Sequence, residues 1–257
     1  MKELLETAAE AARLAGRYQR DRFEEGVEWS YKAPGDPVSE IDRESERLIA
    51  DRIADRYPDH ALLSEERGES GDAPERWIVD PLDGTSNYVR GRTDFCVSIA
   101  LEIDGRVRLG AVYRPMSDDL HAATVEGMTI GDGEIETSDV DDLGSALVAL
   151  PYSSSCRERE AVWDAHRTFG QTSEKLRSAS GALDLAHVAA GKVDVACGFE
   201  QSAWDRAAGL ALVEAGGGRV TDHAGRPNPE EDFVASNGPL HDAALDALDA
   251  DGTLDES

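Results

Sequence analysis

The most informative stretch of this chain is WIVDPLDGTSNY, residues 77–88. An apolar strand runs into Asp80, and Pro81 keeps Asp80 extended while it interrupts regular strand pairing. The chain must turn there, so Asp83 can lie beside Asp80, and Gly84 permits a tight backbone with outward NH groups. Two carboxylates beside an anion-binding turn suit Mg²⁺ and a phosphate group. A capped turn without metal is the alternative, because Asp-Pro and Asp-Gly are common in plain turns.

Acids elsewhere in the chain could complete a metal shell with Asp80. Glu65 and Glu66 follow the apolar pair Leu62-Leu63, where a strand leaving the core would deliver them. Asp205 stands at the start of an apolar helical pattern, where a carboxylate caps free NH groups and is also a rigid metal ligand. Exposed acid on an acidic protein is the alternative for Glu65 and Glu66, and capping alone would explain Asp205.

The 257-residue chain is strongly acidic, with 53 Asp and Glu against 26 Lys and Arg and a formal net charge of −27. This balance argues against nucleic-acid binding. Aromatic residues make up only 6%, and the lysines are Lys2, Lys32, Lys175 and Lys192 alone. The composition is typical of a halophilic archaeon, whose salty cytoplasm screens the repulsion between carboxylates. No acid run or regular spacing of loop carboxylates favours a DNA mimic or a calcium store.

Neither disulfides nor a membrane partner is expected. The cysteines are odd in number, widely spaced and without a CxxC, which predicts buried reduced thiols and not a zinc site; they are Cys96, Cys156 and Cys197. The first residues are acidic from Glu3 on, and no apolar stretch is long enough to span a bilayer. We therefore expect a cytoplasmic protein.

The first half of the chain, residues 1–143, is predicted to hold two helices and an antiparallel sheet that carries most of the acidic candidates. Apolar residues at helical spacing, and Ser39 with Asp42 three residues later, indicate the helices. Asp104-Gly105 is typical of a hairpin turn. The predicted elements are a helix over residues 4–23, a loop over 30–37, a helix over 40–57, and strands over 77–79, 95–103 and 106–113.

The second half, residues 144–257, contributes Asp205 and alternates strands with helices. Strands are predicted over 146–150, 176–178, 193–197, 219–221 and 233–236, and helices over 161–169, 182–190, 205–215 and 240–248. This alternation favours a layered α/β arrangement. The length lies near the upper limit for one core, so we expect the two halves to pack as one unit.

Together these segments resemble the inositol monophosphatase family of Mg²⁺-dependent, lithium-sensitive phosphatases. WIVDPLDGTSNY resembles the family's metal-binding signature, and WDRAAGLALVEAGGGRVTD, residues 204–222, its C-terminal signature. GDPVSEIDRESE, residues 35–46, resembles the segment before the first metal-site glutamate. The resemblance covers nearly the whole chain. It implies an α/β (α+β) fold, the layered αβαβα sandwich of the sugar-phosphatase superfamily, commonly as a homodimer.

The resemblance also implies the metal ligands. Glu65, Asp80 and the carbonyl of Leu82 would hold a first Mg²⁺. Asp80, Asp83 and Asp205 would hold a second, and a weaker third ion would also involve Glu65. Two to three ions per active site are therefore expected.

A metal-activated water is the nucleophile that the resemblance implies. Glu65 and the hydroxyl of Thr85 would orient this water, and Asp42 would in turn hydrogen-bond the hydroxyl. The NH groups of Gly84 and Thr85 would receive the phosphate oxygens. No protein nucleophile is then required.

Substrate contacts are implied for Asp83 and Glu200. Glu200 is the nearest match to a family glutamate that touches a substrate hydroxyl, although the segment 199–203 is shortened here. The implied substrate is a small-molecule phosphate ester, inositol 1-phosphate or a similar small polyol phosphate.

A fructose-1,6-bisphosphatase is the enzymatic alternative, and a dual inositol and fructose phosphatase would combine both. A second phosphate requires positive charge, for which the candidates are Arg90, Arg92, Lys175 and Arg177. A non-catalytic metal-binding or interaction protein is the other alternative. Such a protein would be expected to lose a metal ligand or the threonine, and all of them are present.

Salt should stabilise this protein. Because a net charge of −27 repels itself without screening, we expect the melting temperature to rise between low and multimolar KCl. Thermal denaturation followed by circular dichroism checks this, and a melting temperature that does not depend on KCl would contradict the halophilic interpretation.

Overall fold

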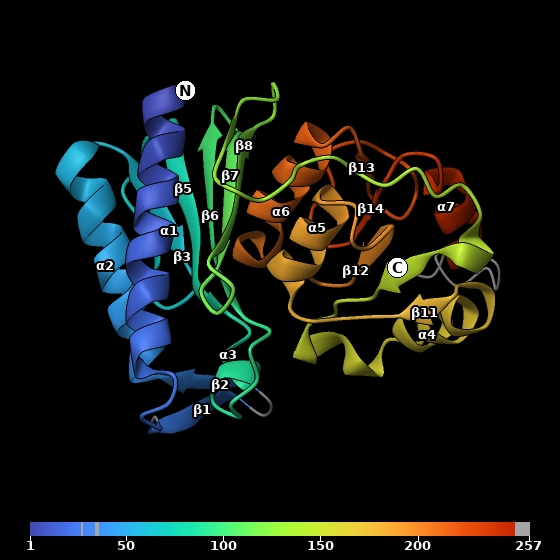
Figure 1. Cartoon of the computed structure of the whole chain (residues 1–257), viewed down its shortest axis with the longest axis horizontal. Helices are drawn as coiled ribbons and strands as arrows, with labels where there is room; N and C mark the ends of the chain where they lie inside the picture. The colour runs from blue at the N-terminus through green and yellow to red at the C-terminus, as the bar shows by residue number, and fades with distance from the viewer. Residues whose placement is uncertain (27, 34–35, 250–257) are drawn as a thin grey trace.

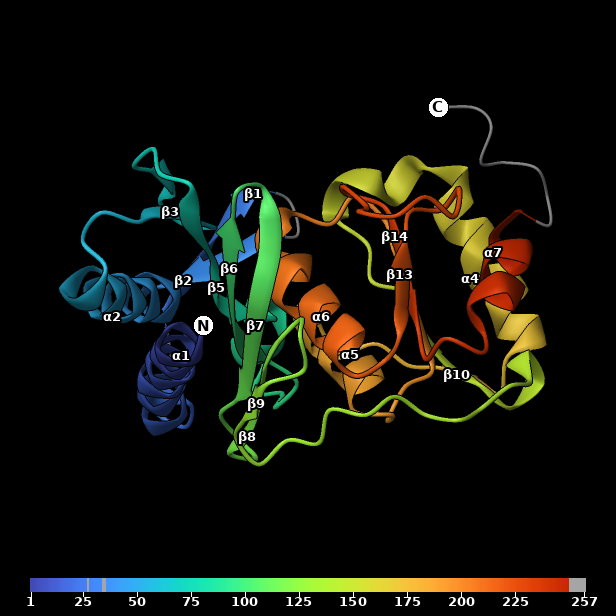
Figure 2. The ribbon, with the colours of Figure 1, turned by 90° about the horizontal axis from the view of Figure 1, so that it is seen from above.

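A computed structural model describes residues 1–26, 28–33 and 36–249, which form alternating layers of helices and sheets (Figure 1). Figure 2 shows the order of the layers from above: a helix pair, a large sheet, a second helix pair, a smaller sheet and a third helix pair. This is the αβαβα sandwich that the resemblance implied, and the mixed α/β class is confirmed.

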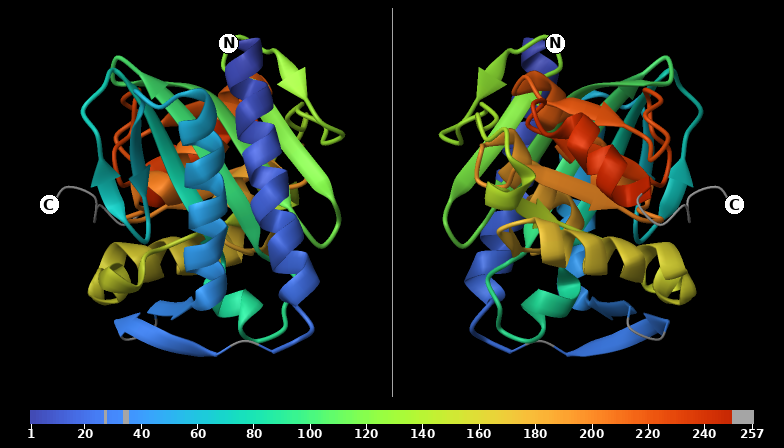
Figure 3. Two further views of the ribbon diagram at one scale, coloured as in Figure 1. Left: turned by 90° about the vertical axis from the view of Figure 1, so that its left-hand side faces the viewer. Right: turned by 90° about the vertical axis from the view of Figure 1, so that its right-hand side faces the viewer.

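The outer helix pair consists of α1 (Lys2–Arg22) and α2 (Glu40–Arg56), which lie side by side over one face of the large sheet (Figure 3). The apolar stripe of α1, which includes Leu5, Ala8 and Ala12, is fully buried. Helix α2 begins with the predicted capping box, in which Ser39 and Asp42 satisfy each other's groups. Both predicted helices are thus confirmed.

The large sheet has seven strands in the order β4-β3-β5-β6-β7-β8-β9. Its strands are β3 (Ala61–Ser64), β4 (Gly68–Ser70), β5 (Glu75–Asp83), β6 (Cys96–Ile103), β7 (Arg106–Arg114), β8 (Asp119–Thr124) and β9 (Thr129–Ile130). The hairpin at Asp104-Gly105 is confirmed, with both residues at positive φ. Pairing is antiparallel except between β3 and β5, which run parallel because the chain returns through β4.

The inner helix pair, α5 (Gly181–Ala189) and α6 (Ala203–Ala215), lies between the large sheet and a five-stranded sheet. That sheet has the order β11-β10-β12-β14-β13. Its strands are β10 (Leu147–Ala149), β11 (Lys175–Leu176), β12 (Val195–Gly198), β13 (Arg219–Thr221) and β14 (Phe233–Ser236). The last layer is α4 (Glu160–Thr172) with α7 (His241–Asp249) (Figure 3).

Three large apolar cores hold the layers together, one for each helix pair. The first joins α1 and α2 to the large sheet around Trp77, the second surrounds α5 and α6, and the third packs α4 and α7 around Phe169. The three cysteines are free and buried, as predicted. No described helix is long and apolar enough to cross a membrane.

The predicted loop over 30–37 was wrong in part. Residues on both sides of the undescribed pair 34–35 form an antiparallel ribbon, β1 (Trp29–Ala33) with β2 (Asp36–Ser39). The Pro and Gly residues suggested an irregular segment. The alternation of Trp29 and Tyr31 with small or charged residues is a strand pattern that this interpretation overlooked.

Helix α6 approaches β7 closely at Gly110. A Cβ atom built there would lie 2.2 Å from the carbonyl oxygen of Ala208 in α6. Only a glycine lets the backbones of these two elements come this close, and α6 carries Asp205. The position of one candidate ligand therefore depends on this contact.

Gly110→Ala should destabilise the protein by about 1–3 kcal/mol, because overpacking at a backbone contact forces α6 away from the sheet. The expected fall in melting temperature is about 2–10 °C. Gly170→Ala is the matched control. Gly170 is exposed on α4, and a Cβ atom there would lie 3.8 Å from Leu176, an ordinary van der Waals distance. Gly170→Ala should raise the melting temperature slightly, because alanine favours a helix more than glycine does. Equal changes in melting temperature for the two variants would refute a packing role of Gly110.

Candidate metal centre and substrate pocket

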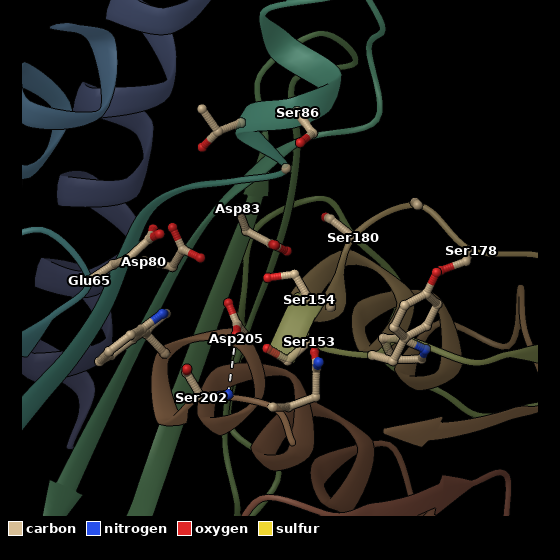
Figure 4. A pocket seen from close by; sticks show the side chains of 18 of the residues that line it. Glu65, Asp80, Asp83, Ser86, Ser153, Ser154, Ser178, Ser180, Ser202 and Asp205 are labelled. Carbon is tan, nitrogen blue, oxygen red and sulfur yellow. Dashed lines mark hydrogen bonds between the residues drawn. The ribbon is translucent and has the colours of Figure 1, made fainter. Parts of the chain in front are cut away.

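Three aspartates converge at one end of the large sheet. Asp80 and Asp83 lie at the end of β5, where the register shifts between them, and Asp205 lies in the first turn of α6. One carboxylate oxygen from each lies within 4.8 Å of the others. Figure 4 shows the three side chains pointing toward a common space. The three aspartates predicted for the second metal site thus come together from segments more than a hundred residues apart.

Each of these aspartates is held by a backbone NH group. The bonds run from Leu82 N to Asp80 Oδ1 at 2.9 Å, from Ala182 N to Asp83 Oδ2 at 2.9 Å, and from Ser202 N to Asp205 Oδ2 at 3.2 Å. Because each bond uses one carboxylate oxygen, the other oxygen can face a cation. The donors on α5 and at the start of α6 make the site rigid.

The buried carboxylates of the cluster repel one another, so a positive charge among them would stabilise the site. Burial, followed by the charges of Glu65 and Asp83, raises the pKa of Asp80 well above its usual range. Burial also raises the pKa of Asp205 to about 8, with Asp83 and Glu65 adding to the effect. Hard carboxylate oxygens that repel one another are the donor set that Mg²⁺ takes. The residues therefore fit a divalent cation.

Glu65 follows β3 and lines the same cavity as the aspartates. Its Oε1 accepts a hydrogen bond from Lys32 Nζ at 2.7 Å, and Lys32 also binds Glu66 at 2.7 Å. Burial raises the pKa of Glu65 to about 7, against the opposing charge of Lys32. Sequence reasoning missed Lys32, because it lies on the β1–β2 ribbon, which no local pattern connects to Glu65.

The predicted contact between Thr85 and Asp42 is present. Thr85 Oγ1 donates to Asp42 Oδ1 at 2.7 Å, and Asp42 Oδ2 accepts from the backbone and the hydroxyl of Ser39. Asp42 is fully buried, and burial raises its pKa while the Ser39 and Thr85 donors oppose that shift. Asp42 therefore combines the capping role with the role that the resemblance implied.

The turn after β5 has the geometry that its sequence required. Gly84 adopts φ +96°, and a Cβ there would lie 2.9 Å from the carbonyl oxygen of Asp94. Short helix α3 (Thr85–Tyr88) begins directly after it. The carbonyl of Leu82 lies 3.0 Å from Thr85 Oγ1, and Leu82, Gly84 and Thr85 all line the cavity. The first NH groups of a helix have no partner within it.

The cavity has a volume of about 770 Å³ and extends well beyond the acids. We call its other side the far wall, which is lined by Ser153, Ser154, Arg157, His166, Ser178 and Gln201. Figure 4 shows Ser153, Ser154 and Ser178 across the space from Glu65 and Asp80. These residues were not predicted as site residues, since they come from the short helix η2 (Ser154–Glu158) and its N-cap, from loops and from α4.

Glu200 does not belong to the described lining of the cavity. Its φ of +48° and a bond from its NH group to Asp232 turn it away from the pocket. Its carboxylate accepts from Ser155 Oγ at 2.8 Å and lies 3.4 Å from Arg159. The neighbouring Gln201 faces the pocket in its place, so the geometry gives no support to a substrate contact by Glu200.

The basic residues considered for a second phosphate also lie outside the described lining. Arg90 donates to the carbonyl of Ser86, Arg92 pairs with Asp94, and Arg177 donates to the carbonyl of Leu176. Lys175 is exposed on β11. The positive charges that line the cavity are Lys32 and Arg157.

Comparisons with known proteins identify the family of this chain. The model of the inositol monophosphatase family matches residues 1–251. An inositol-1-monophosphatase of Mesorhizobium japonicum is 36% identical over 256 residues, which cover 95% of this chain and 96% of that protein. The Nus factor SuhB of Escherichia coli is 35% identical over 235 residues, 89% of this chain and 88% of that protein.

Solved structures give the same result. An inositol monophosphatase from Anabaena superposes with a TM-score of 0.86 at 31% identity, covering 96% of this chain and 95% of that one. SuhB from Bartonella henselae superposes with a TM-score of 0.89 at 32% identity, covering 96% and 98%. The family model matches nearly the whole chain, which also has the carboxylate cluster and the layered fold described above. This chain therefore belongs to the inositol monophosphatase family.

Proposed function

We propose that the protein is a Mg²⁺-dependent phosphomonoesterase that hydrolyses inositol 1-phosphate or a similar small polyol phosphate, with two to three ions per active site. The observation that carries this proposal is the convergence of Asp80, Asp83 and Asp205 within 4.8 Å in a cavity that also contains Thr85. The relative named inositol-1-monophosphatase supports the substrate class. The family resemblance also supports a homodimer.

The ions would be held by Glu65, Asp80, Asp83, Asp205 and the carbonyl of Leu82. When bound, Mg²⁺ would supply positive charge for the phosphate and lower the pKa of water. Lys32 occupies only Oε1 of Glu65, so Oε2 is not used by that contact. The described chain contributes carboxylates at this end of the pocket and only Lys32 as a cation, so a phosphate would be repelled without added positive charge.

Thr85 would orient the attacking water. Because its hydroxyl proton is given to Asp42 Oδ1, the lone pairs of Thr85 Oγ1 can accept a hydrogen bond from water. Ser39 fixes the carboxylate of Asp42, so the acceptor direction at Thr85 is set before the substrate arrives.

The phosphate and the leaving alcohol would take the remaining sides of the pocket. The NH groups of Gly84 and Thr85, at the start of α3, would donate to the non-bridging phosphate oxygens. The serine hydroxyls and Gln201 of the far wall can donate to and accept from the hydroxyls of a polyol.

Asp80→Asn tests the proposed function. Loss of a shared ligand should lower phosphate release from inositol 1-phosphate with Mg²⁺ on the order of a thousandfold, since several kcal/mol of charge stabilisation are lost. Without metal, the melting temperature should not fall, because one of the mutually repelling carboxylates has gone. Asp141→Asn, at an exposed position, is the control. Full activity of the Asp80→Asn variant would refute the assignment of the site.

Thr85→Val should lower kcat about a hundredfold and leave KM nearly unchanged, because the variant keeps the shape of the side chain but removes the acceptor for water. Thr85→Ser retains the hydroxyl and should restore most of kcat. Steady-state kinetics of both variants, with melting temperatures to verify folding, make the comparison. Equal kcat values for valine and serine would exclude Thr85 from the chemistry.

A further inference from the structure

The peptide unit between Pro81 and Leu82 lies at the centre of the turn that carries two candidate metal ligands. The ladder between β5 and β6 pairs Asp80 and Asp83 but passes over these two residues, so their polar groups need other partners. Leu82 N donates to Asp80 Oδ1 at 2.9 Å. The carbonyl of Pro81, at the other end of the same peptide unit, accepts from Nε2 of Gln19 at 2.6 Å. A side chain of α1 therefore takes part in this turn.

Gln19 is a fully buried polar residue on a helix face that consists mainly of alanine. Its side-chain amide has two hydrogens, and the second is donated to Ser45 Oγ of α2 at 3.0 Å. Within the described part of the chain, Oε1 of Gln19 has no hydrogen-bond partner. A buried acceptor without a partner costs free energy, so packing alone would favour an apolar side chain of the same size. The contact with Pro81 is a reason for an amide at this position.

Gln19 acts on Asp80 through the planar peptide unit. The Pro81–Leu82 peptide bond is trans, so its C=O and N–H groups point in opposite directions. The hydrogen bond from α1 therefore fixes the plane from which Leu82 N–H donates to the carboxylate of Asp80. A donor to the carbonyl also polarises the peptide unit, which strengthens its N–H as a donor. Both effects hold the Asp80 carboxylate in one orientation.

A second contact ties the same part of α1 to α3. Tyr88, the last residue of α3, donates from Oη to the backbone carbonyl of Gln19 at 2.8 Å. The side chains of Leu82 and Tyr88 belong to one apolar cluster with Ile41 and Phe95. The C-terminal part of α1 thus supports both the metal-binding turn and the short helix that follows it (Figure 1).

We infer that Gln19 is a positioning residue of the metal centre, whose amide orients the Pro81–Leu82 peptide and, through it, the carboxylate of Asp80 for Mg²⁺. This inference rests on the proposed function, because it takes Asp80 as a Mg²⁺ ligand. Gln19 does not belong to the described lining of the cavity, so it acts through the turn and not on the substrate. Its loss should weaken the affinity for Mg²⁺ and leave turnover intact once the metal is bound.

The test measures Mg²⁺ binding to the substrate-free protein by isothermal titration calorimetry at one fixed KCl concentration. Gln19→Met removes the amide but keeps an unbranched side chain of similar length, so the Pro81 carbonyl loses its donor. Ser45→Ala is the matched control, because it removes the other hydrogen bond of the same amide and leaves the bond to Pro81.

Melting temperatures without metal verify folding and should fall by a similar amount, about 2–8 °C, in both variants. If Gln19→Met alone does not fold, the double variant Gln19→Met/Ser45→Ala takes its place, since it sets two apolar side chains against each other. Its dissociation constant for Mg²⁺ is then compared with that of Ser45→Ala.

Gln19→Met should raise the Kd for Mg²⁺ about tenfold or more, the effect typical of residues that orient metal ligands, whereas Ser45→Ala should stay within about twofold of the native protein. The Mg²⁺ concentration for half-maximal phosphate release from inositol 1-phosphate should rise in parallel, while kcat at saturating Mg²⁺ stays near the native value. An unchanged Kd in Gln19→Met, or equal increases in the two variants, overturns the positioning role alone. Native protein that binds Mg²⁺ but releases no phosphate overturns the proposed function alone, and native protein that binds no Mg²⁺ overturns both.

Discussion

Mutual repulsion among buried carboxylates is the constraint on which the site depends. Asp80, Asp83 and Asp205 lie within 4.8 Å of one another, and burial raises the pKa of each. In the unfolded chain these groups are separate and hydrated, so folding without a cation costs free energy. The fold compensates in part through one backbone NH group for each carboxylate. A divalent cation would supply the rest, which couples metal binding to stability.

The layered architecture delivers these groups to one place. Strand β5 supplies two aspartates across its irregular register, α6 supplies the third, and α5 donates its NH group to Asp83. Helix α6 can lie this close to the large sheet because Gly110 has no side chain to meet the backbone of Ala208. The site thus lies where a sheet and the inner helix pair meet, and small shifts between these layers would open it.

The same pocket separates its charges. The acids needed for metal are concentrated at the end of β5, while Arg159 and Asp232 hold Glu200 away from the far wall. A strongly negative net charge makes the approach of a phosphate less favourable. The acids are thus gathered where a metal could neutralise them, and Arg157 lines the other side of the pocket.

Residues 77–88 by themselves determined the turn that pairs Asp80 with Asp83, because Pro81 and Gly84 restrict the local backbone. Helical periodicity and the Ser39–Asp42 capping box likewise determined α1 and α2, since these are interactions between near neighbours. Only the tertiary structure decided that Lys32 reaches Glu65, that β3 pairs parallel to β5, and that Gln201 and not Glu200 faces the pocket. Those outcomes depend on contacts between segments that are far apart in the chain. The packing of the layers sets the relative positions of these segments, and such contacts leave no local pattern in the sequence.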